Sequence, residues 1–169
     1  MAVSIRPFLA RDIEKILATD GGPAWKRWPE PWHDIVRQRD EGLRTVLIAA
    51  DDGEVTGYGS LIWQSRYARF RDADVPEISD LVIAQSRRGE RIGALLLQAL
   101  EAEAIRAGKA VVGIGVGLYA DYGAAQRLYV SQGYVPDGHG ITYDYADIAP
   151  GASVLLDDDL ILWMLKRLE

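Results

Sequence analysis

The segment from Val75 to Ala107 constrains the fold of this chain more than any other part of the sequence. Residues 75–83 form a largely apolar run, which is typical of a buried strand, and a basic turn containing glycine follows it. Beyond the turn, apolar residues recur at helical spacing, at Ile92, Leu95, Leu96, Ala99 and Leu100. Gly108 then stands where a left-handed residue commonly ends a helix. The pattern predicts a strand, a tight turn and an amphipathic helix over residues 89–107.

Shorter patterns on both sides of this segment predict further strands and helices. Strands are expected over residues 3–6, 45–50, 55–63, 110–116 and 160–168, with one broken strand over 134–135 and 140–145. Helices are expected over residues 11–18, 32–41 and 122–132, and a charged, exposed loop over 66–73. The residues Asp51-Asp52-Gly53-Glu54 predict a hairpin turn. Because hairpins precede strand–helix–strand units, we expect one α/β domain over residues 1–169, with a mixed sheet and helices on both faces.

The composition excludes several classes of protein. There are no cysteines, so disulfide scaffolds, thiolate metal sites and cysteine nucleophiles are excluded. With only two histidines, His33 and His139, we expect no metal site. The 19 basic and 25 acidic residues give a net charge of −6, which argues against a nucleic-acid partner. No apolar stretch is long enough to cross a membrane and the first residues do not resemble a signal peptide, so we expect a cytoplasmic protein without a membrane partner.

The turn between the predicted strand and helix has the chemistry of an anion site. It contains Arg87, Arg88 and Arg91 around Gly89. The first N–H groups of a helix lack intrahelical partners, and the helix dipole places partial positive charge at the same end. Glycine in addition allows the backbone to approach a phosphate closely. The alternative is that the arginines are solvated surface charges and that Gly89 only forms a turn.

Two separate motifs resemble those of the GNAT superfamily of acetyl-CoA-dependent N-acetyltransferases. The first joins the strand residues Leu81-Val82-Ile83 to the turn Arg88-Gly89-Glu90-Arg91-Ile92-Gly93, followed by Ala94. The second is Ala125-Gln126-Arg127-Leu128-Tyr129-Val130-Ser131-Gln132-Gly133-Tyr134. Arg91 stands where the first motif glycine is usual in the family, and Tyr122 stands where an asparagine is usual. The resemblance implies the GNAT fold, a mainly antiparallel sheet with splayed central parallel strands and helices on both faces.

The resemblance also implies roles for individual residues. Acetyl-CoA would be the cofactor, its pantetheine and thioester held by the backbone of Leu81, Val82 and Ile83. Its pyrophosphate would be held by Arg88, Gly89, Glu90, Arg91, Ile92, Gly93 and Ala94. Tyr129 aligns with the family's general acid, and a phenol stays protonated at neutral pH and can donate to the departing thiolate. Glu77 matches the base of the histone-acetyltransferase branch, and Asp80 is the weaker candidate for that role.

Each of these roles has a structural alternative that the sequence leaves open. Tyr129 would otherwise simply pack on its helix. Trp25, Trp28 and Trp32 would line a pocket for an apolar or cationic acceptor, or they would pack as core beneath a long loop. The residues Gly115-Val116-Gly117-Leu118-Tyr119-Ala120 fit a dinucleotide-binding fingerprint, but too little chain follows them for such a domain.

The resemblance therefore implies an enzyme that moves an acetyl group from acetyl-CoA to a primary amine, by direct attack through a tetrahedral intermediate. We favour a small-molecule amine because the tryptophans predict a pocket rather than an open groove. Two alternatives stay open: a non-catalytic acyl-CoA-binding sensor of the same fold, and an acetyltransferase for protein N-termini or lysines. The remaining expected partner is a second copy of the chain in a homodimer.

Overall fold

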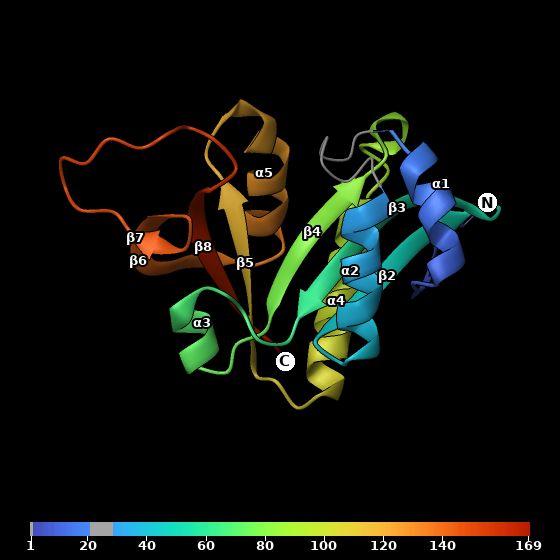
Figure 1. Ribbon diagram of the computed structural model, residues 1–169, viewed down its shortest axis with the longest axis horizontal. Helices are drawn as coiled ribbons and strands as arrows, with labels where there is room; N and C mark the ends of the chain where they lie inside the picture. The colour runs from blue at the N-terminus through green and yellow to red at the C-terminus, as the bar shows by residue number, and fades with distance from the viewer. Residues whose placement is uncertain (1, 21–28) are drawn as a thin grey trace. The chain divides into compact units, whose positions relative to one another are not determined.

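The computed structural model describes residues 2–20 and 29–169 of the chain. The chain divides into two compact units. The first unit comprises Met1–Trp63 with Ile78–Glu103, and the second comprises Gln64–Glu77 with Ala104–Glu169. Each unit is described by itself below, and the elements of both are labelled in Figure 1.

The first unit contains the strands in the order β1, β2, β3 and β4. Their bounds are β1 (Ser4–Pro7), β2 (Arg44–Asp51), β3 (Glu54–Ile62) and β4 (Glu77–Ile83), of which only Glu77 belongs to the second unit. β1 pairs with β2 and β2 with β3, both antiparallel. The predicted hairpin joins β2 to β3, where Asp52 and Gly53 both have positive φ, as a tight hairpin turn requires.

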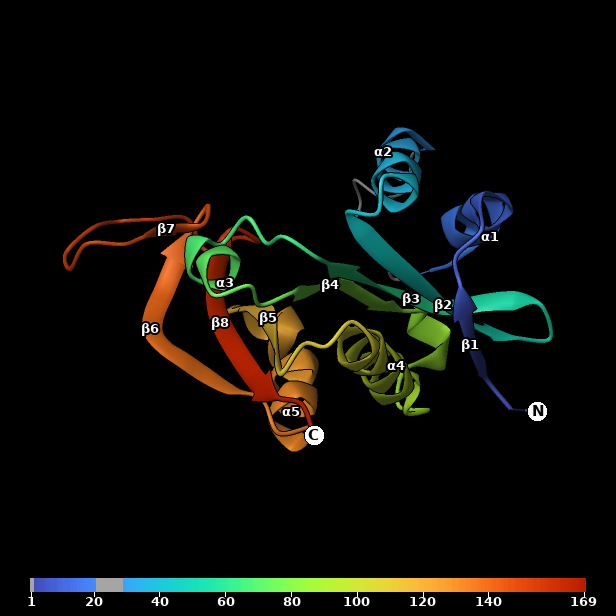
Figure 2. The same ribbon diagram turned by 90° about the horizontal axis from the view of Figure 1, so that it is seen from below.

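Helices cover both faces of the strands in the first unit. α1 (Ile13–Ala18) and α2 (Pro29–Asp40) lie on one side of β2 and β3, and α4 (Ile92–Arg106) lies on the other side (Figure 2). Apolar side chains from α1, α2 and these strands form the core beneath the first two helices. Helices on both faces of strands are the arrangement that the sequence predicts for an α/β fold, and this class is confirmed.

The second unit contains the strands in the order β5, β8, β6 and β7. Their bounds are β5 (Val111–Gly117), β6 (Val135–Tyr143), β7 (Ala146–Asp147) and β8 (Leu160–Arg167), and the helices are α3 (Ala68–Asp72) and α5 (Gly123–Ser131). β8 pairs antiparallel with both β5 and β6. The register of β6 shifts between Pro136 and Ile141, which confirms the break that the sequence predicts in this strand. The segment between β7 and β8 forms a long projecting loop (Figure 1).

The expectation of an exposed loop over residues 66–73 is wrong. The helix α3 occupies this segment, and Tyr67 and Phe70 are buried in the core of the second unit. The Tyr67 ring stacks on Trp163 with centroids 4.4 Å apart. Gly113 leaves space for Phe70, because a Cβ at this glycine would lie 2.1 Å from the ring. The arginines of the segment favour a solvated loop in the sequence pattern, whereas in the structure its aromatic residues pack it against the core of the second unit.

Two helices begin three residues away from the expected position, each for a local reason. α2 begins at Pro29 rather than Trp32, because proline fits the first turn of a helix, where its missing N–H costs no hydrogen bond. α4 begins at Ile92 rather than Gly89, because Gly89 and Arg91 both have positive φ. Among the residues that the structure describes, no helix is both long and apolar enough to cross a bilayer.

Candidate functional site

The turn between β4 and α4 has the backbone geometry of an anion site. A short 3₁₀ helix, Gln85–Arg87, follows β4, and Gly89 (φ 88°) and Arg91 (φ 63°) then adopt left-handed conformations. Turns of this kind orient successive backbone N–H groups toward one point. The N–H groups of Ile92 and its neighbours add to them, because the first turn of α4 lacks intrahelical acceptors. We call residues 88–94 the anion-binding turn.

Arg87 ties this turn to the rest of the first unit. Its Nε donates to both carboxylate oxygens of Glu90 at 2.9 Å, and its Nη2 donates to Asp51 Oδ2 at 2.9 Å. The hydrogen bonds with Glu90 and Asp51 raise the pKa of Arg87 above its ordinary value. This arginine therefore stabilises the shape of the turn, and its charge is already matched by protein carboxylates.

Arg91, at the position where the motif usually has a glycine, has a backbone conformation that glycine adopts readily. Its positive φ is uncommon for a residue with a side chain and is adopted readily by glycine. The side chain is exposed, and it makes no hydrogen bond or ion pair within residues 2–20 and 29–169. The departure from the motif thus preserves the turn and adds a cation at its surface.

The end of β4 leads directly into the anion-binding turn. Leu81, Val82 and Ile83 are half-buried and form the last three residues of the strand. Gly57 of β3 lies close against this stretch, since a Cβ there would be 2.8 Å from the Val82 carbonyl oxygen. The cofactor residues predicted from the first motif, 81–83 and 88–94, therefore follow one another along a single strand, turn and helix start.

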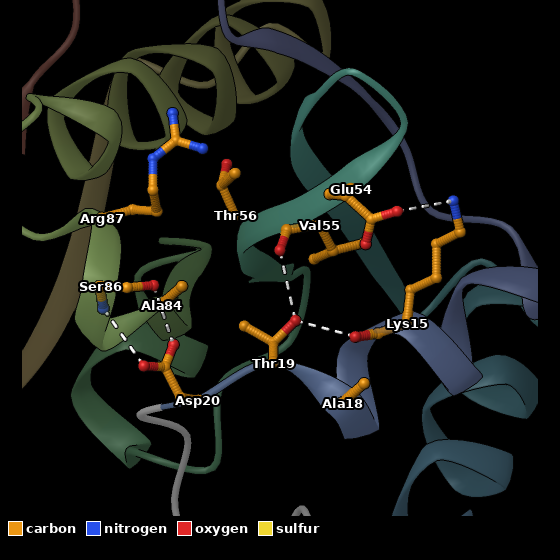
Figure 3. Close-up of a pocket in the computed structure, with 10 residues that line it drawn as sticks. All are labelled: Lys15, Ala18, Thr19, Asp20, Glu54, Val55, Thr56, Ala84, Ser86 and Arg87. Carbon is orange, nitrogen blue, oxygen red and sulfur yellow. Dashed lines mark hydrogen bonds and ion pairs between the residues drawn. The ribbon is translucent and has the colours of Figure 1, made fainter.

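A polar pocket of about 370 Å³ borders this turn at Ser86 and Arg87 (Figure 3). Its other lining residues come from α1, the segment after it and the start of β3, among them Lys15, Asp20 and Glu54. Lys15 Nζ donates to the Gly53 carbonyl, and Asp20 accepts a weak hydrogen bond from the Ser86 N–H at 3.3 Å. Both cations that line the described part of the pocket, Lys15 and Arg87, are thus already engaged by protein oxygens.

Tyr129 of α5 lies in the second unit, where it is only 6% exposed. Burial raises the pKa of its phenol above the ordinary value. Its ring lies 6.1 Å from that of Tyr134, and no hydrogen bond reaches its hydroxyl from the part of the chain that the structure describes. The side chain is therefore a protonated phenol that keeps its proton across the neutral range.

Glu77 is also in the second unit and is equally buried, at 6% exposure. The Ser65 hydroxyl donates to Glu77 Oε2 at 2.6 Å, and Ser65 Oγ accepts from the Tyr67 N–H at 3.0 Å. Within the described residues, Tyr129 and Glu77 make no hydrogen bond to each other. Whether they act as acid and base is a prediction that the geometry leaves standing.

Residues near Tyr122 hold the C-terminal end of β5, a role that the sequence patterns do not predict. The ring of Tyr122 packs on Gly117, where a Cβ would lie 2.3 Å from it. Gln126 Nε2 donates to the Gly117 carbonyl at 2.9 Å, and the Tyr122 hydroxyl donates to Asp158 at 2.8 Å. The only signal in the sequence for this contact was the Gln126 amide itself, four residues after Tyr122, where the motif usually has an asparagine.

The three tryptophans predicted to line an acceptor pocket are only partly described. Trp25 and Trp28 lie outside the described residues. Trp32 is completely buried in the core of the first unit, between Phe8 and Tyr58, with ring centroids 5.8 and 5.0 Å away. For Trp32 the position agrees with core packing, the alternative that the sequence left open, and its contact with an acceptor stays a prediction.

Known proteins resemble this chain in sequence and in structure. A model of the Acetyltransferase (GNAT) family matches residues 10–134. No match was found among proteins of curated function. Among the described residues, no three His, Asp or Glu side chains are grouped so that they could hold a metal ion.

Solved structures resemble the chain over its whole length. A ribosomal-protein-alanine N-acetyltransferase from Brucella melitensis is 25% identical, with a TM-score of 0.71 and 98% of this chain and 99% of that chain covered. The yncA protein from Salmonella typhimurium, solved with its cofactor acetyl-CoA, is 21% identical, with a TM-score of 0.72 and coverage of 100% and 95%. The PaiA N-acetyltransferase from Thermoplasma acidophilum, in complex with coenzyme A, is 16% identical, with a TM-score of 0.65 and 99% of each chain covered.

Proposed function

The chain belongs to the acetyltransferase (GNAT) family, and we propose that it transfers the acetyl group of acetyl-CoA to a primary amine of a small molecule. The observation that carries the proposal is the anion-binding turn. Gly89 and Arg91 hold the left-handed conformations there, immediately before a helix of 15 residues. A pyrophosphate is the ligand that such a helix start favours.

The residues of the first unit fit acetyl-CoA. The N–H groups of residues 88–94 would hold the pyrophosphate, and the Arg91 side chain, exposed and without an ion pair among the described residues, would add charge toward a phosphate. The backbone of Leu81, Val82 and Ile83 would hold the pantetheine arm. The structures of yncA with acetyl-CoA and of PaiA with coenzyme A support this cofactor.

Two side chains of the second unit supply the proton chemistry of the proposal. Bound acetyl-CoA supplies an activated acetyl thioester. Tyr129 would donate its proton to the departing sulfur, a role that suits a phenol whose pKa is raised by burial. Glu77 would accept a proton from the amine, directly or through water, with its carboxylate oriented by Ser65.

A second candidate is acetylation of a protein N-terminus. It is favoured by the 25% identity to the ribosomal-protein-alanine N-acetyltransferase, which covers 98% of this chain. The third candidate is an acyl-CoA-binding sensor without turnover. It would release no thiol when amines and acetyl-CoA are added, whereas both enzymes would. The first two candidates are distinguished by screening a library of small amines and short peptides and measuring the mass of the acetylated product.

We further propose the domain organisation, the location and the partners of the protein. The match to the Brucella melitensis structure, over 98% of this chain and 99% of that chain, supports one acetyltransferase domain over residues 1–169. The use of acetyl-CoA supports a cytoplasmic location, and the net charge of −6 supports a partner other than nucleic acid. Exposed apolar side chains of the second unit, Val135, Leu155 and Leu156, support a homodimer.

Cofactor binding is tested by thermal unfolding with acetyl-CoA. At a hundredfold excess over the dissociation constant, the ligand should stabilise the protein by about 2.7 kcal/mol. Gly93→Glu should abolish this gain, because it places bulk and negative charge at the helix start. Ala107→Glu, an exposed position just beyond the other end of α4, adds the same charge and should leave the gain intact. An unchanged melting temperature of the wild-type protein in millimolar acetyl-CoA would contradict the proposal.

A further inference from the structure

The polar pocket beside the anion-binding turn has no part in the acetyl transfer proposed above. Its volume of about 370 Å³ suits a small organic ligand, and all the residues that line its described part belong to the first unit (Figure 3). Three of these residues, Thr19, Thr56 and Ser86, carry hydroxyl groups. The kind of ligand that fits follows from which polar groups of the wall still have hydrogen-bonding capacity.

The hydroxyl groups of the pocket have already donated their protons. Thr19 Oγ1 and Thr56 Oγ1 each donate to a main-chain carbonyl, at 2.8 and 3.1 Å. Ser86 Oγ donates weakly to Asp20 Oδ1 at 3.4 Å, and the Ser86 N–H donates to Asp20 Oδ2 at 3.3 Å. A hydroxyl has a single proton and two lone pairs, so these three groups can still accept a hydrogen bond.

The two cations of the pocket wall are held by protein oxygens. Lys15 Nζ donates to a main-chain carbonyl and lies 4.0 Å from Glu54 Oε1. Arg87 is shared by two carboxylates, those of Glu90 and Asp51. The second oxygen of Asp51 is buried and has no hydrogen-bond partner in the described part of the chain. Carboxylates therefore outnumber cations around the pocket, and acceptors exceed the donors available to them.

Asp20 is the carboxylate of the pocket wall with the most unused capacity. The two long hydrogen bonds from Ser86 are the contacts of its side chain within residues 2–20 and 29–169. An ionised carboxylate can accept about four hydrogen bonds. Glu54 lies on a different side of the pocket (Figure 3), and its side chain is 77% exposed. A ligand in the pocket therefore meets one carboxylate inside and another at the rim.

A wall of acceptors with an excess of negative charge fits a ligand that brings donors and positive charge. We propose that the pocket binds the ammonium group of a small organic amine, with Asp20 as the main contact and the hydroxyl oxygens of Thr19, Thr56 and Ser86 as further acceptors. An ammonium group has three donors and no acceptor, so each of its protons finds an oxygen there. The inference does not rest on the proposed function, because it concerns binding alone.

The experiment compares three ligands of equal chain length that differ in charge: diaminobutane, butanediol and succinate. Calorimetry with the full-length protein, without acetyl-CoA, measures the binding of each. We expect the diamine to bind and the diol and the dianion not to bind. Added salt should weaken the binding of the diamine, because it screens the attraction between ammonium and carboxylate.

Variants of the two carboxylates locate the site. Asp20→Asn should weaken diaminobutane about tenfold, because a charge-assisted hydrogen bond is lost. Glu54→Gln should weaken it only about two- to threefold, because an exposed ion pair contributes little. Glu14→Gln removes the same charge from an exposed position of α1 outside the pocket lining, and it should leave the affinity unchanged.

The Asp20→Asn variant keeps an oxygen that can accept from Ser86, so its melting temperature should equal that of the wild type. No binding of diaminobutane to the wild type, equal affinity in Asp20→Asn, or equal binding of the diol and the diamine would each overturn the inference.

The bound amine could be the acceptor of acetyl transfer or a separate effector, and mass spectrometry with acetyl-CoA distinguishes the two. Acetylated diaminobutane whose formation falls in Asp20→Asn identifies the pocket as the acceptor site. Binding without acetylation identifies an effector site. Failure of the proposed function leaves the calorimetric result unaffected, because that measurement requires no cofactor.

Discussion

The anion-binding turn of the first unit and Tyr129 of the second unit differ in what their proposed roles require. One role depends on the backbone and the other on a single side chain. In the proposed function the turn binds through backbone N–H groups, and its conformation is held by Gly89, Arg91 and the Arg87 contacts. Tyr129 depends on one hydroxyl and on the apolar surroundings that keep it protonated. A backbone site tolerates exchange of side chains as long as its dihedral angles survive, whereas a site made of one functional group does not.

This contrast explains how the chain departs from the family pattern at Arg91 and keeps the motif tyrosine. Arg91 adopts a left-handed conformation that glycine also adopts readily, so a glycine at this position would leave the N–H groups of the turn in the same direction. At position 129, by contrast, exchange of tyrosine for phenylalanine removes the proton donor. Substitutions in the two places should therefore differ greatly in their effect.

The largest effect is expected from Tyr129→Phe. The change removes the oxygen and keeps the ring, so kcat should fall by about 10²–10⁴-fold, the usual contribution of general acid catalysis. Affinity for coenzyme A should change little, and KM for the amine should change less than kcat. Steady-state kinetics with titration of coenzyme A provides the measurement.

Stability gives the control for this variant. Because no hydrogen bond reaches the Tyr129 hydroxyl from the described residues, Tyr129→Phe should unfold at the same temperature as the wild type or higher. A lower melting temperature with unchanged kcat would identify Tyr129 as a structural residue and leave proton delivery to water.

A small effect is expected from Arg91→Ala in the turn. Loss of one exposed cation near a phosphate should weaken coenzyme A about two- to fivefold, and the difference should disappear at high salt. Arg91→Gly should lose the same cation but raise the stability of the free protein, because glycine adopts a positive φ without strain. Equal affinity for coenzyme A in all three proteins would show that Arg91 makes no phosphate contact.

The smallest effect appears only at alkaline pH and again separates the two places. The folded pKa of Tyr129 lies above its unfolded value of about 10, so its contribution to stability is complete below that pH and is lost as the pH rises through the folded pKa. Above about pH 10, the wild type should lose up to about 1.4 kcal/mol per pH unit more than Tyr129→Phe. Urea unfolding between pH 8 and 11.5 measures this difference.

Arg87→Gln provides the comparison for the turn in the same pH series. The hydrogen bonds to Glu90 and Asp51 raise the pKa of Arg87 further above its ordinary value, so this guanidinium stays charged throughout the range. The stability difference between Arg87→Gln and the wild type should therefore stay constant from pH 8 to 11.5. The contrast between the turn and Tyr129 would be contradicted by either of two results. In one, the stability difference from the wild type grows with pH for Arg87→Gln. In the other, it stays constant with pH for Tyr129→Phe.

Local patterns were sufficient to predict most of the fold. Period and turn chemistry gave the hairpin at Asp52 and Gly53, the long helix after the turn and the break in β6, because each depends on neighbouring residues. The segment 66–73 could not be predicted in this way. Its burial depends on Trp163 and on the space beside Gly113, and both are far from it in sequence.

The candidate site was predictable only where a motif is continuous in the chain. The anion-binding turn occupies one run of residues, so its spacing was sufficient. The hydrogen bond from Ser65 to Glu77 joins residues that are 12 positions apart in the sequence. No local pattern distinguishes Ser65 from the other serines of the chain, since only the fold brings its hydroxyl to Glu77.

The contact between Arg87 and Asp51 has a consequence for the rate of cofactor capture. It fixes the turn to the β2–β3 hairpin in the folded chain, so the entropy of ordering this loop is lost during folding and not during the encounter with a ligand. The second oxygen of Asp51 is buried without a hydrogen-bond partner in the described structure, so breaking the contact would leave a desolvated charge uncompensated. We therefore expect the turn to need little ordering when a ligand binds, which favours fast association.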